Sequence, residues 1–406
     1  MNILVLNCGS SSVKYSVWKI DYSGNKNVSE KRLVSGLIDC IGVSGVPCRH
    51  IKTRSDNGTA ALPEELNVQN HSEAVAYIIE MLKKEGISSL AAVGHRVVQG
   101  GDKFKEPIIV NEEVKEAITN YFDIAPLHNP SNLEGIIACE KNYPGILNVA
   151  VFDTAFHTTI NEVASTYAIP RYLAKKYDIK KYGFHGISHE YISREVAALY
   201  PGYRRIISCH LGNGSSITAI KDGRSVDTSM GFSPLEGLVM GTRPGDLDPE
   251  IPLYLMEKEG LKPSELLAIF NKQSGVAGIS GISSDMRKLI AVSDEDASAR
   301  LAVDVFCYRV KKYIGAYIAA LDGADAVVFT AGIGENSPLI RKKITDGLTF
   351  FGIYIDDKKN ETAIAKFREI HLKEKSKIAV LVIPTNEDLL IARESARLVS
   401  QSGDLR

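Results

Sequence analysis

Hydrophobic runs and polar turns follow one another in the same order in both halves of the chain. Residues 2–17 read NILVLNCGSSSVKYSV and residues 205–220 read RIISCHLGNGSSITAI, each with two apolar runs around a glycine-serine turn. This pattern predicts a β-hairpin at the start of each half. The tip of such a turn offers backbone N–H groups and hydroxyls to anionic oxygen. The repeat therefore predicts a duplicated fold with phosphate held between its halves, although two unrelated hairpins with ordinary Gly/Ser turns remain an alternative.

After its hairpin, the first half alternates between helical and strand patterns. The segment 71–84 has apolar residues at helical spacing, whereas 91–98 and 147–152 are short apolar runs typical of strands. Asn129-Pro130 predicts a helix start, with a cap residue followed by proline at the first helical position. We expect strands over 3–6, 13–19, 32–38, 91–98 and 147–152, helices over 71–84, 111–121 and 129–142, and a loop or β-excursion over 52–70.

The second half repeats this order. We expect strands over 206–209, 216–221, 224–228, 326–330 and 378–383. We expect helices over 188–199, 249–259 and 263–272, from a capped start at 293–296 to about 321, from 338, and from 385 to the end. Thr385 and Asp388 have the spacing of a helix cap and a first-turn acid. A strand meander followed by alternating helix and strand predicts an α/β protein with mixed sheets covered by helices. The domain boundary is expected near 150–155, with the last helix returning to the first domain.

Composition narrows the class of protein. A chain of 406 residues predicts two or three domains, and 44% apolar with 24% charged residues is typical of a soluble globular protein. The net charge of −1 argues against a general nucleic-acid surface. We find no signal-peptide pattern and no apolar run near the roughly 20 residues that span a bilayer. The six scattered cysteines indicate reduced, mostly buried thiols and a cytoplasmic location, and metal binding through sulfur is disfavoured.

Polar residues gather where the predicted strands end, which is where open α/β sheets bind ligands. Singly, each is more often a cap or a solvated strand end, but together they indicate a site. The chain has no G-x-x-x-x-G-K-[ST], no G-x-G-x-x-G opening a βαβ unit and no G-x-S-x-G. Its glycine turns lie inside hairpins or in GIGEN, a different way to hold a nucleotide. The strand-end residues are Asn7, Arg96, Asp153, His210, residues 332–336 and Glu387.

Ten motifs in order resemble the acetate kinase family, within the superfamily of acetate and sugar kinases, heat-shock-70 and actin. The resemblance runs from the first strand to the last helix. One departure is Gln99, where the family more commonly has histidine. The motifs are LNCGSSSVKY at 6–15, GHRVVQGG at 94–101, APLHNP at 125–130, VFDTAFH at 151–157, YGFHGISH at 182–189, CHLGNGSS at 209–216, DTSMGFSPLEGLVMGTRPGDLDP at 227–249, SGISSDMR at 280–287, FTAGIGENS at 329–337 and PTNEDLLIA at 384–392.

The resemblance implies duplicated ribonuclease H-like (actin-like ATPase) domains with mixed sheets flanked by helices. Residues 1–152 with 385–406 would form an N-terminal acetate domain, and 153–384 a C-terminal nucleotide-binding and dimerisation domain. The implied reaction is direct in-line phosphoryl transfer from ATP to acetate, giving ADP and acetyl phosphate reversibly, with Mg²⁺ or Mn²⁺. The implied partners are these small molecules and a second copy of the chain, with neither nucleic acid nor membrane.

The resemblance assigns the transferring phosphoryl group to Arg96, Arg243 and His185. A guanidinium is always charged and forks onto two oxygens, so arginine suits this role, and Arg96 would also hold the acetate carboxylate. The alternative for either arginine is an ordinary ion pair. His189, one helical turn beyond His185, is expected to support it. A lone histidine is usually structural, and we expect this of His50, His71 and His371.

Asn7 and Glu387 match the family positions that hold Mg²⁺, partly through water, although a turn asparagine and a first-turn helix acid explain them too. Asp153 matches the family's proposed proton acceptor. However, a simple carboxylic acid with a pKa of about 4 to 5 is already ionised at neutral pH and needs no general base. We therefore expect Asp153 to orient an arginine or a metal-bound water.

The remaining site residues form two sets that the resemblance implies. The nucleotide set is Lys14, His210, Leu211, Gly212, Asn213, Gly214, Asp285, Met286, Arg287, Gly332, Ile333, Gly334, Glu335 and Asn336. The pocket for the acetate methyl is Val98, Leu127, Phe184 and Pro234, for which core packing is the alternative.

Three other functions stay open at this stage. A propionate kinase differs by one methylene, worth only about 1–3 kcal/mol in a pocket. Butyrate kinase is more distant, and the runs DTSMGFSPLEG and GTRPGD favour the acetate branch. A non-catalytic nucleotide-gated module of the actin or heat-shock-70 type would need neither a second arginine nor a small apolar pocket beside Arg96.

Overall fold

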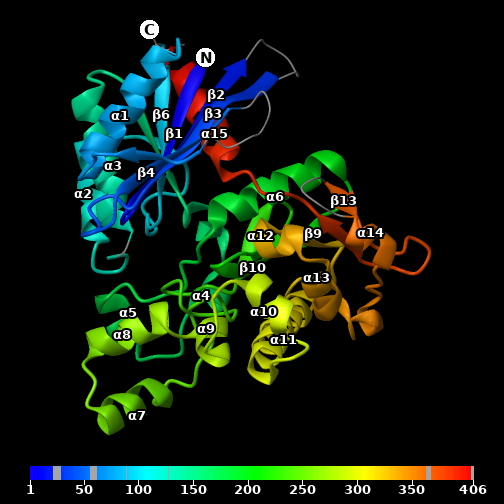
Figure 1. The fold of residues 1–406 in the computed structure, drawn as a ribbon. Helices are drawn as coiled ribbons and strands as arrows, with labels where there is room; N and C mark the ends of the chain where they lie inside the picture. The colour runs from blue at the N-terminus through cyan, green and yellow to red at the C-terminus, as the bar shows by residue number, and fades with distance from the viewer. Residues whose placement is uncertain (22–28, 55–61, 88, 127, 363–366, 404–406) are drawn as a thin grey trace. The chain divides into compact units, whose positions relative to one another are not determined.

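The chain forms two compact units. The computed structural model describes residues 1–21, 29–54, 62–87, 89–126, 128–362 and 367–403 (Figure 1). One unit comprises Met1–Ala155 with Asn386–Arg406, and the other comprises Phe156–Thr385. The chain thus returns to the first unit for its last helix, while the separate functions expected of the two domains stay a prediction.

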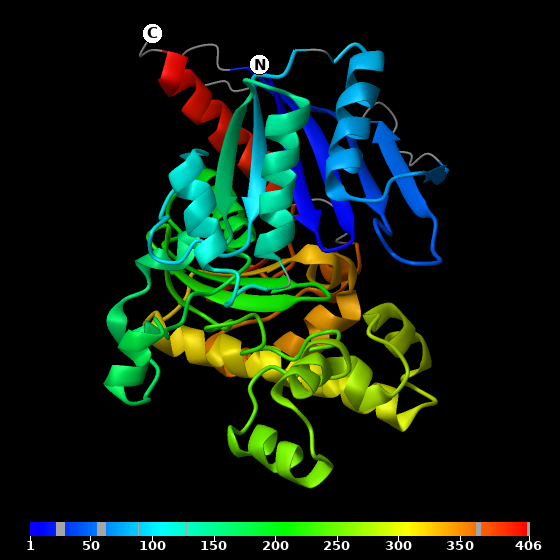
Figure 2. The ribbon, with the colours of Figure 1, turned by 90° about the vertical axis from the view of Figure 1, so that its left-hand side faces the viewer.

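The first unit is built on an eight-stranded mixed sheet in the order β5-β4-β3-β2-β1-β6-β8-β7. Alternate side chains of β1 face opposite sides: Leu4 and Leu6 pack in one core with α1 and α3. On β6, Gly94 meets α15, which lies across the sheet from α1 and α3 (Figure 2). The elements are β1 (Asn2–Gly9), β2 (Ser12–Asp21), β3 (Ser29–Asp39), β4 (Cys48–Arg54), β5 (Glu64–Leu66), α1 (His71–Lys84), β6 (Ala92–Val97), β7 (Ile108–Ile109), α2 (Glu112–Asn120), α3 (Asn129–Asn142), β8 (Leu147–Phe152) and α15 (Glu387–Gly403).

The second unit has a six-stranded sheet in the order β11-β10-β9-β12-β14-β13. Its largest core lies between this sheet and the long helix α11. Its strands are β9 (Arg205–Leu211), β10 (Ser215–Lys221), β11 (Arg224–Thr228), β12 (Ala326–Thr330), β13 (Arg368–Glu369) and β14 (Ala379–Val382). Its helices are α4 (Glu162–Ser165), α5 (Arg171–Lys176), α6 (Gly186–Leu199), α7 (Glu250–Glu259), α8 (Pro263–Lys272), α9 (Gly275–Ser280), α10 (Met286–Val292), α11 (Ala297–Ala320), α12 (Ala331–Asn336), α13 (Pro338–Thr345) and α14 (Asp357–Glu361), with short 3₁₀ turns at Ala155–Thr159 and Thr349–Phe351.

The two sheets share one topology. In the first, β1 pairs antiparallel with β2 and parallel with β6, β2 pairs antiparallel with β3, and β6 pairs parallel with β8. In the second, β9, β10, β11, β12 and β14 make the same pairings in the same order. The duplicated α/β fold with mixed, helix-flanked sheets is therefore confirmed, and the repeated hairpin of the sequence is the start of each copy.

Three local predictions need correction. Helix α15 is capped by Asn386, whose Oδ1 accepts from Leu389 N–H, while the Thr385 hydroxyl bonds to Ser188 instead. Helix α3 begins at Asn129 itself, and the Asn129 amide spans the backbone N–H and C=O of Gln99. The GIGEN segment forms the short helix α12 rather than a turn.

Two broader expectations can be compared with the structure. All six cysteines are free thiols, five of them buried, as predicted. Among the described residues, no helix combines the length and the apolar character needed to cross a bilayer.

The packing of α15 on the first sheet predicts a stability effect at Gly94. A Cβ at this position would lie 2.5 Å from Ser395 Oγ and 2.6 Å from Ile391 Cγ2. Gly94→Ala should therefore lower the free energy of unfolding by about 1–3 kcal/mol through overpacking. Gly315→Ala is the control, because a Cβ there meets no atom within 4 Å and alanine favours its helix. Urea denaturation with equal midpoints for Gly94→Ala and the wild type would contradict this packing.

Candidate active site

Arg96 lies at the centre of a charged cluster in the first unit. It stands near the end of β6, and its Nη2 donates to Asp153 Oδ2 at 2.6 Å. Its Nε lies 3.8 Å from Glu387 Oε2, at the start of α15. Asp153 follows β8 directly, and its side chain is only 1% exposed, against 17% for Arg96. The structure therefore brings together three of the predicted strand-end residues.

The cluster holds more acid than it can neutralise. Burial raises the pKa of Glu387; Arg96 opposes this rise, while Asp153 and Asp388 add to it. Burial also raises the pKa of Asp388. Raised carboxylate pKa values in a group of this kind are typical of a site that takes up positive charge.

The donor set near this cluster fits Mg²⁺. Asn7 lies inside β1, two residues before the strand ends at Gly9, and pairs with Lys14 on β2, whose charge in turn lowers the pKa of Glu387. An amide and a carboxylate supply the hard oxygen ligands that Mg²⁺ prefers. In the described ranges no three His, Cys, Asp or Glu side chains gather to hold a metal by themselves.

In the second unit, His185 and Arg243 meet at the glycine turn between β9 and β10. A Cβ on Gly214 would lie 3.4 Å from His185 Nε2 and 3.9 Å from Arg243 Nη1, so both side chains lie close to the backbone of this turn. His185 caps α6 with a φ of 57°, a left-handed conformation that is rare outside glycine. Such strain is typical of functional positions.

Arg243 is a partly buried cation with no described carboxylate partner. Its Nη1 donates only a long bond, 3.4 Å, to Pro234 O. Burial lowers the pKa of Arg243, and no nearby acid among the described residues opposes that shift. A guanidinium stays charged at neutral pH, so Arg243 is arranged for an anion that the chain does not supply.

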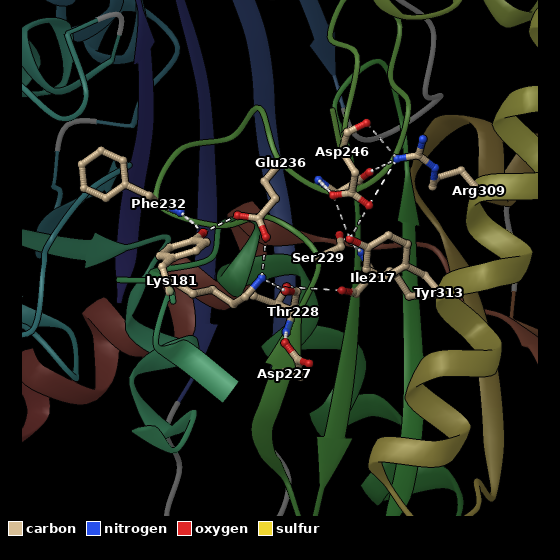
Figure 3. Close-up of polar contacts among 12 residues, drawn as sticks. Lys181, Ile217, Asp227, Thr228, Ser229, Phe232, Glu236, Asp246, Arg309 and Tyr313 are labelled. Carbon is tan, nitrogen blue, oxygen red and sulfur yellow. Dashed lines mark hydrogen bonds and ion pairs between the residues drawn. The ribbon is translucent and has the colours of Figure 1, made fainter. Parts of the chain in front are cut away.

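Hydrogen bonds and ion pairs of two acids, Glu236 and Asp246, hold the loop that carries Pro234 and Arg243 (Figure 3). Glu236 accepts from the Tyr167 hydroxyl and from Lys181 Nζ at 3.1 Å. Asp246 accepts from Gly237 N–H at 2.9 Å and from the Tyr313 hydroxyl, and pairs with Arg309 at 3.2 Å. These contacts reach α11 and the segment before α6, so they fix the loop against two parts of the unit. Their partners are far apart in sequence, which is why sequence patterns did not reveal them.

A cavity of about 750 Å³ lies beside the same glycine turn. This volume suits a small-molecule ligand such as a nucleotide. Eight predicted nucleotide residues line it, namely Gly212, Asn213, Asp285, Met286, Arg287, Gly332, Ile333 and Asn336. The other predicted residues lie elsewhere: Lys14 belongs to the first unit, and His210, Leu211, Gly214, Gly334 and Glu335 do not line the cavity.

Arg341, which sequence analysis missed, supports the GIGEN segment that lines part of this cavity. Its side chain is fully buried in α13, and Nη1 donates to Gly334 O at 2.8 Å and to Glu335 O at 2.9 Å. Its Nε and Nη2 bond to Asn360. Arg341 thus satisfies the carbonyls at the end of α12 and holds the GIGEN segment in place.

The predicted apolar pocket is described only in part. Val98 and Phe184 are buried and Pro234 is partly buried, while Leu127 lies outside the described residues. Val98 belongs to the first unit, and Phe184 and Pro234 belong to the second. A common role for these residues stays a prediction.

The histidines expected to be structural are hydrogen-bonded inside the first or second unit. His50 bonds to the Tyr15 and Tyr77 hydroxyls. His71 Nε2 donates to Gly9 O at 2.6 Å, and His371 Nδ1 lies 3.4 Å from Val380 O. Each therefore has a partner that accounts for its burial.

Comparison with known proteins places this geometry in a family. The model of the acetokinase family matches residues 2–393. The chain belongs to the acetokinase family. Membership confirms the resemblance seen in the sequence and makes the chain a kinase that phosphorylates a carboxylate.

Relatives and solved structures agree with this membership. An acetate kinase of Caldicellulosiruptor saccharolyticus is 49% identical, covering 99% of this chain and 100% of the relative. The crystal structure of Porphyromonas gingivalis acetate kinase has a TM-score of 0.89 at 40% identity, covering 98% of this chain and 99% of that one. A propionate kinase from Francisella tularensis has a TM-score of 0.88 at 39% identity, covering 97% and 98%.

Because Asp246 holds the loop that carries Arg243, we expect substitution of Asp246 to lower the catalytic rate. Asp246→Ala removes the acceptor of Gly237 N–H and the partner of Arg309, so the loop loses its fixed position. We expect kcat to fall on the order of 10-fold or more, because small misplacements of a catalytic group are costly. The KM for ATP should change little, since Asp246 does not line the cavity.

The matched control is Asp304→Ala, which removes an exposed aspartate of α11 that pairs with Lys343 of α13. Steady-state kinetics should show the loss of kcat only for Asp246→Ala. A wild-type kcat in Asp246→Ala would show that the loop holds Arg243 without this acid.

Proposed function

We propose that the chain transfers the γ-phosphoryl group of ATP to acetate, reversibly, giving acetyl phosphate and ADP by direct in-line displacement. The observation that carries the proposal is Arg243, a partly buried guanidinium with no described acid partner, at a glycine turn beside a cavity of nucleotide size. Phosphoryl transfer needs positioning and charge stabilisation more than covalent chemistry, and an arginine at the transferring group supplies both.

Each remaining residue has a role in this proposal. Arg96 binds the acetate carboxylate, and Asp153 orients the Arg96 guanidinium through its 2.6 Å bond. Asp153 does not need to remove a proton, because acetate is already ionised at neutral pH. His185 hydrogen-bonds the phosphoryl oxygens near Gly214. Asn7 and Glu387 would hold a Mg²⁺ or Mn²⁺ ion that neutralises phosphate charge when bound.

Acetate is the proposed acceptor, and propionate is the second candidate because of the similar propionate kinase structure. Purified protein with ATP and Mg²⁺ should form acyl phosphate, trapped as the hydroxamate, with the highest kcat/KM for acetate. Propionate should be poorer by about 10-fold to 200-fold, the range for one methylene. Removal of the metal by chelation should abolish the product. Absence of hydroxamate with acetate, propionate and butyrate would refute the proposal.

Substitution of the two arginines should have different effects on kcat and on the KM for acetate. Arg96→Ala should raise the KM for acetate and also lower kcat, because Arg96 binds the carboxylate in both ground and transition states. Arg243→Ala should lower kcat on the order of 10³–10⁵-fold with a smaller change in that KM. Lysine at either position should restore only part of the activity, since its point charge does not fork onto two oxygens.

Steady-state kinetics of the four variants, with folding checked by circular dichroism, test this assignment. Arg194→Ala is the control, because it removes an arginine whose i,i+4 contact with Glu190 lies at the surface of the second unit. If Arg243→Ala keeps its kcat and loses only acetate affinity, the two roles are assigned wrongly.

We also propose that the chain acts as a homodimer, through its second unit, in the cytoplasm. Support comes from the resemblance and from the free, mostly buried cysteines, which suit a reducing compartment. Sedimentation at micromolar concentration should give twice the 44.3 kDa of one chain, and a monomer mass would contradict the dimer.

A further inference from the structure

A line of alternating serine and histidine side chains leads to His185 from the interior of the second unit. Ser208 Oγ on β9 lies 2.9 Å from His189 Nδ1. His189 Nε2 lies 2.8 Å from Ser216 Oγ on β10, and the same oxygen lies 2.9 Å from His185 Nδ1. His189 follows His185 by one turn of α6. Four side chains from three elements therefore form one continuous path of hydrogen bonds.

For each hydrogen bond along this path, the donor and the acceptor can be assigned. Ser208, His189 and Ser216 are fully buried, so their hydrogen bonds must be made within the protein. In the part of the chain that the structure describes, His189 Nδ1 is the one partner of Ser208 Oγ, and a buried hydroxyl would donate its proton there. His189 Nδ1 then accepts and carries no proton of its own.

The same assignment of donors and acceptors extends from His189 to His185. Burial lowers the pKa of His189 well below its ordinary value, so the ring is neutral and has its single proton on Nε2. That N–H donates to Ser216 Oγ, which leaves the Ser216 hydroxyl proton for His185 Nδ1. In neutral His185 the proton is thereby placed on Nε2, the nitrogen that faces Gly214.

The opposite assignment, with every donor and acceptor exchanged, is unfavourable at both ends of the path. It would leave the Ser208 hydroxyl without an acceptor among the described residues, at a cost of about 1–3 kcal/mol for a buried group. It would also turn the lone pair of His185 Nε2 toward the glycine turn, where the proposed function puts anionic phosphoryl oxygens. A lone pair and an anion repel each other, whereas an N–H and an anion attract.

We propose that Ser208, His189 and Ser216 are positioning residues that fix neutral His185 as its Nε2–H tautomer, so that it donates a hydrogen bond to the transferring phosphoryl group. The identity of the acceptor rests on the proposed function, whereas the tautomer rests on the path alone. His185 then acts at neutral pH without first binding a proton from solvent. With its Nε2 lone pair replaced by N–H, His185 is a donor and not a phosphoryl-accepting nucleophile.

The test combines nitrogen NMR of the histidine rings with kinetics. In full-length wild-type protein labelled with nitrogen-15, neutral His185 should show a pyrrole-type Nε2 and a pyridine-type Nδ1. Ser216→Ala removes the hydroxyl that bonds to Nδ1, so the ring should lose this preference and populate both tautomers. Its kcat should fall by about 10-fold to 100-fold, the usual effect of losing a group that orients a functional histidine. The KM values for acetate and ATP should change by less than about 3-fold.

Two further variants separate positioning from general damage. His189→Gln keeps an N–H donor toward Ser216 and should retain the Nε2–H tautomer and part of kcat. Ser225→Ala is the matched control, because it removes a buried serine hydroxyl that bonds to a different buried histidine, His157. It should leave the His185 tautomer unchanged.

Three results would overturn the proposal: an Nδ1–H tautomer in the wild type, an unchanged tautomer in Ser216→Ala, or an equal loss of tautomer in Ser225→Ala. The tautomer is measured by NMR in the absence of substrate. The measurement therefore tests the hydrogen-bonded path even if the wild type forms no acyl phosphate. A failed hydroxamate assay with an intact Nε2–H tautomer would refute the proposed function and leave the path standing.

Discussion

The parallel pairing of the central strands determines where the polar side chains of the candidate site lie. In each sheet one hairpin strand runs beside two further parallel strands, so three carboxyl ends meet at one edge. In the first unit this edge carries Asn7, Arg96 and Asp153, and in the second it carries the turn after His210 and the GIGEN segment. Side chains at such an edge leave the apolar core while staying close together, which is the general condition for a ligand site in α/β sheets.

The two arginines proposed to act on the phosphoryl group differ in how their charge is balanced. Arg96 has a buried aspartate at 2.6 Å and a glutamate beyond it, so its guanidinium is held in one orientation before any ligand arrives. Arg243 is partly buried without a described acid, and the loop that carries it is held by Glu236 and Asp246 instead. A buried cation without a partner is costly in the free protein. That cost is offset when an anion binds, and the fixed loop means that little reorganisation is needed at that moment.

Local sequence patterns identified the longer helices and the central strands, but not the contacts that hold the site together. The limits of α1 and β8 match their patterns exactly, because helical spacing and a short apolar run are local signals. Thr385 and Asn129 were misread because each amide or hydroxyl has a partner outside its own helix. A local pattern cannot show such a choice.

The same limit explains the residues that were missed. Asp246 meets Arg309 and Tyr313 across more than sixty positions of sequence, and Ser216 joins two histidines from another element. Arg341 reads as an ordinary helix cation until the fold shows that it is fully buried. The nucleotide residues, by contrast, came from the resemblance to the family, and eight of them line one cavity. The sequence therefore identified the chemical groups, while the supporting contacts required the three-dimensional structure.

The central claim is that the phosphoryl group passes directly from nucleotide to carboxylate, with His185 and the arginines stabilising charge and no side chain becoming phosphorylated. The most direct test is the stereochemical course of the reaction, followed with ATP made chiral at the γ-phosphorus by oxygen isotopes. A single in-line displacement inverts the configuration, and inversion in the acetyl phosphate is the result we predict. Net retention would require two displacements through a phosphorylated residue and would contradict the account.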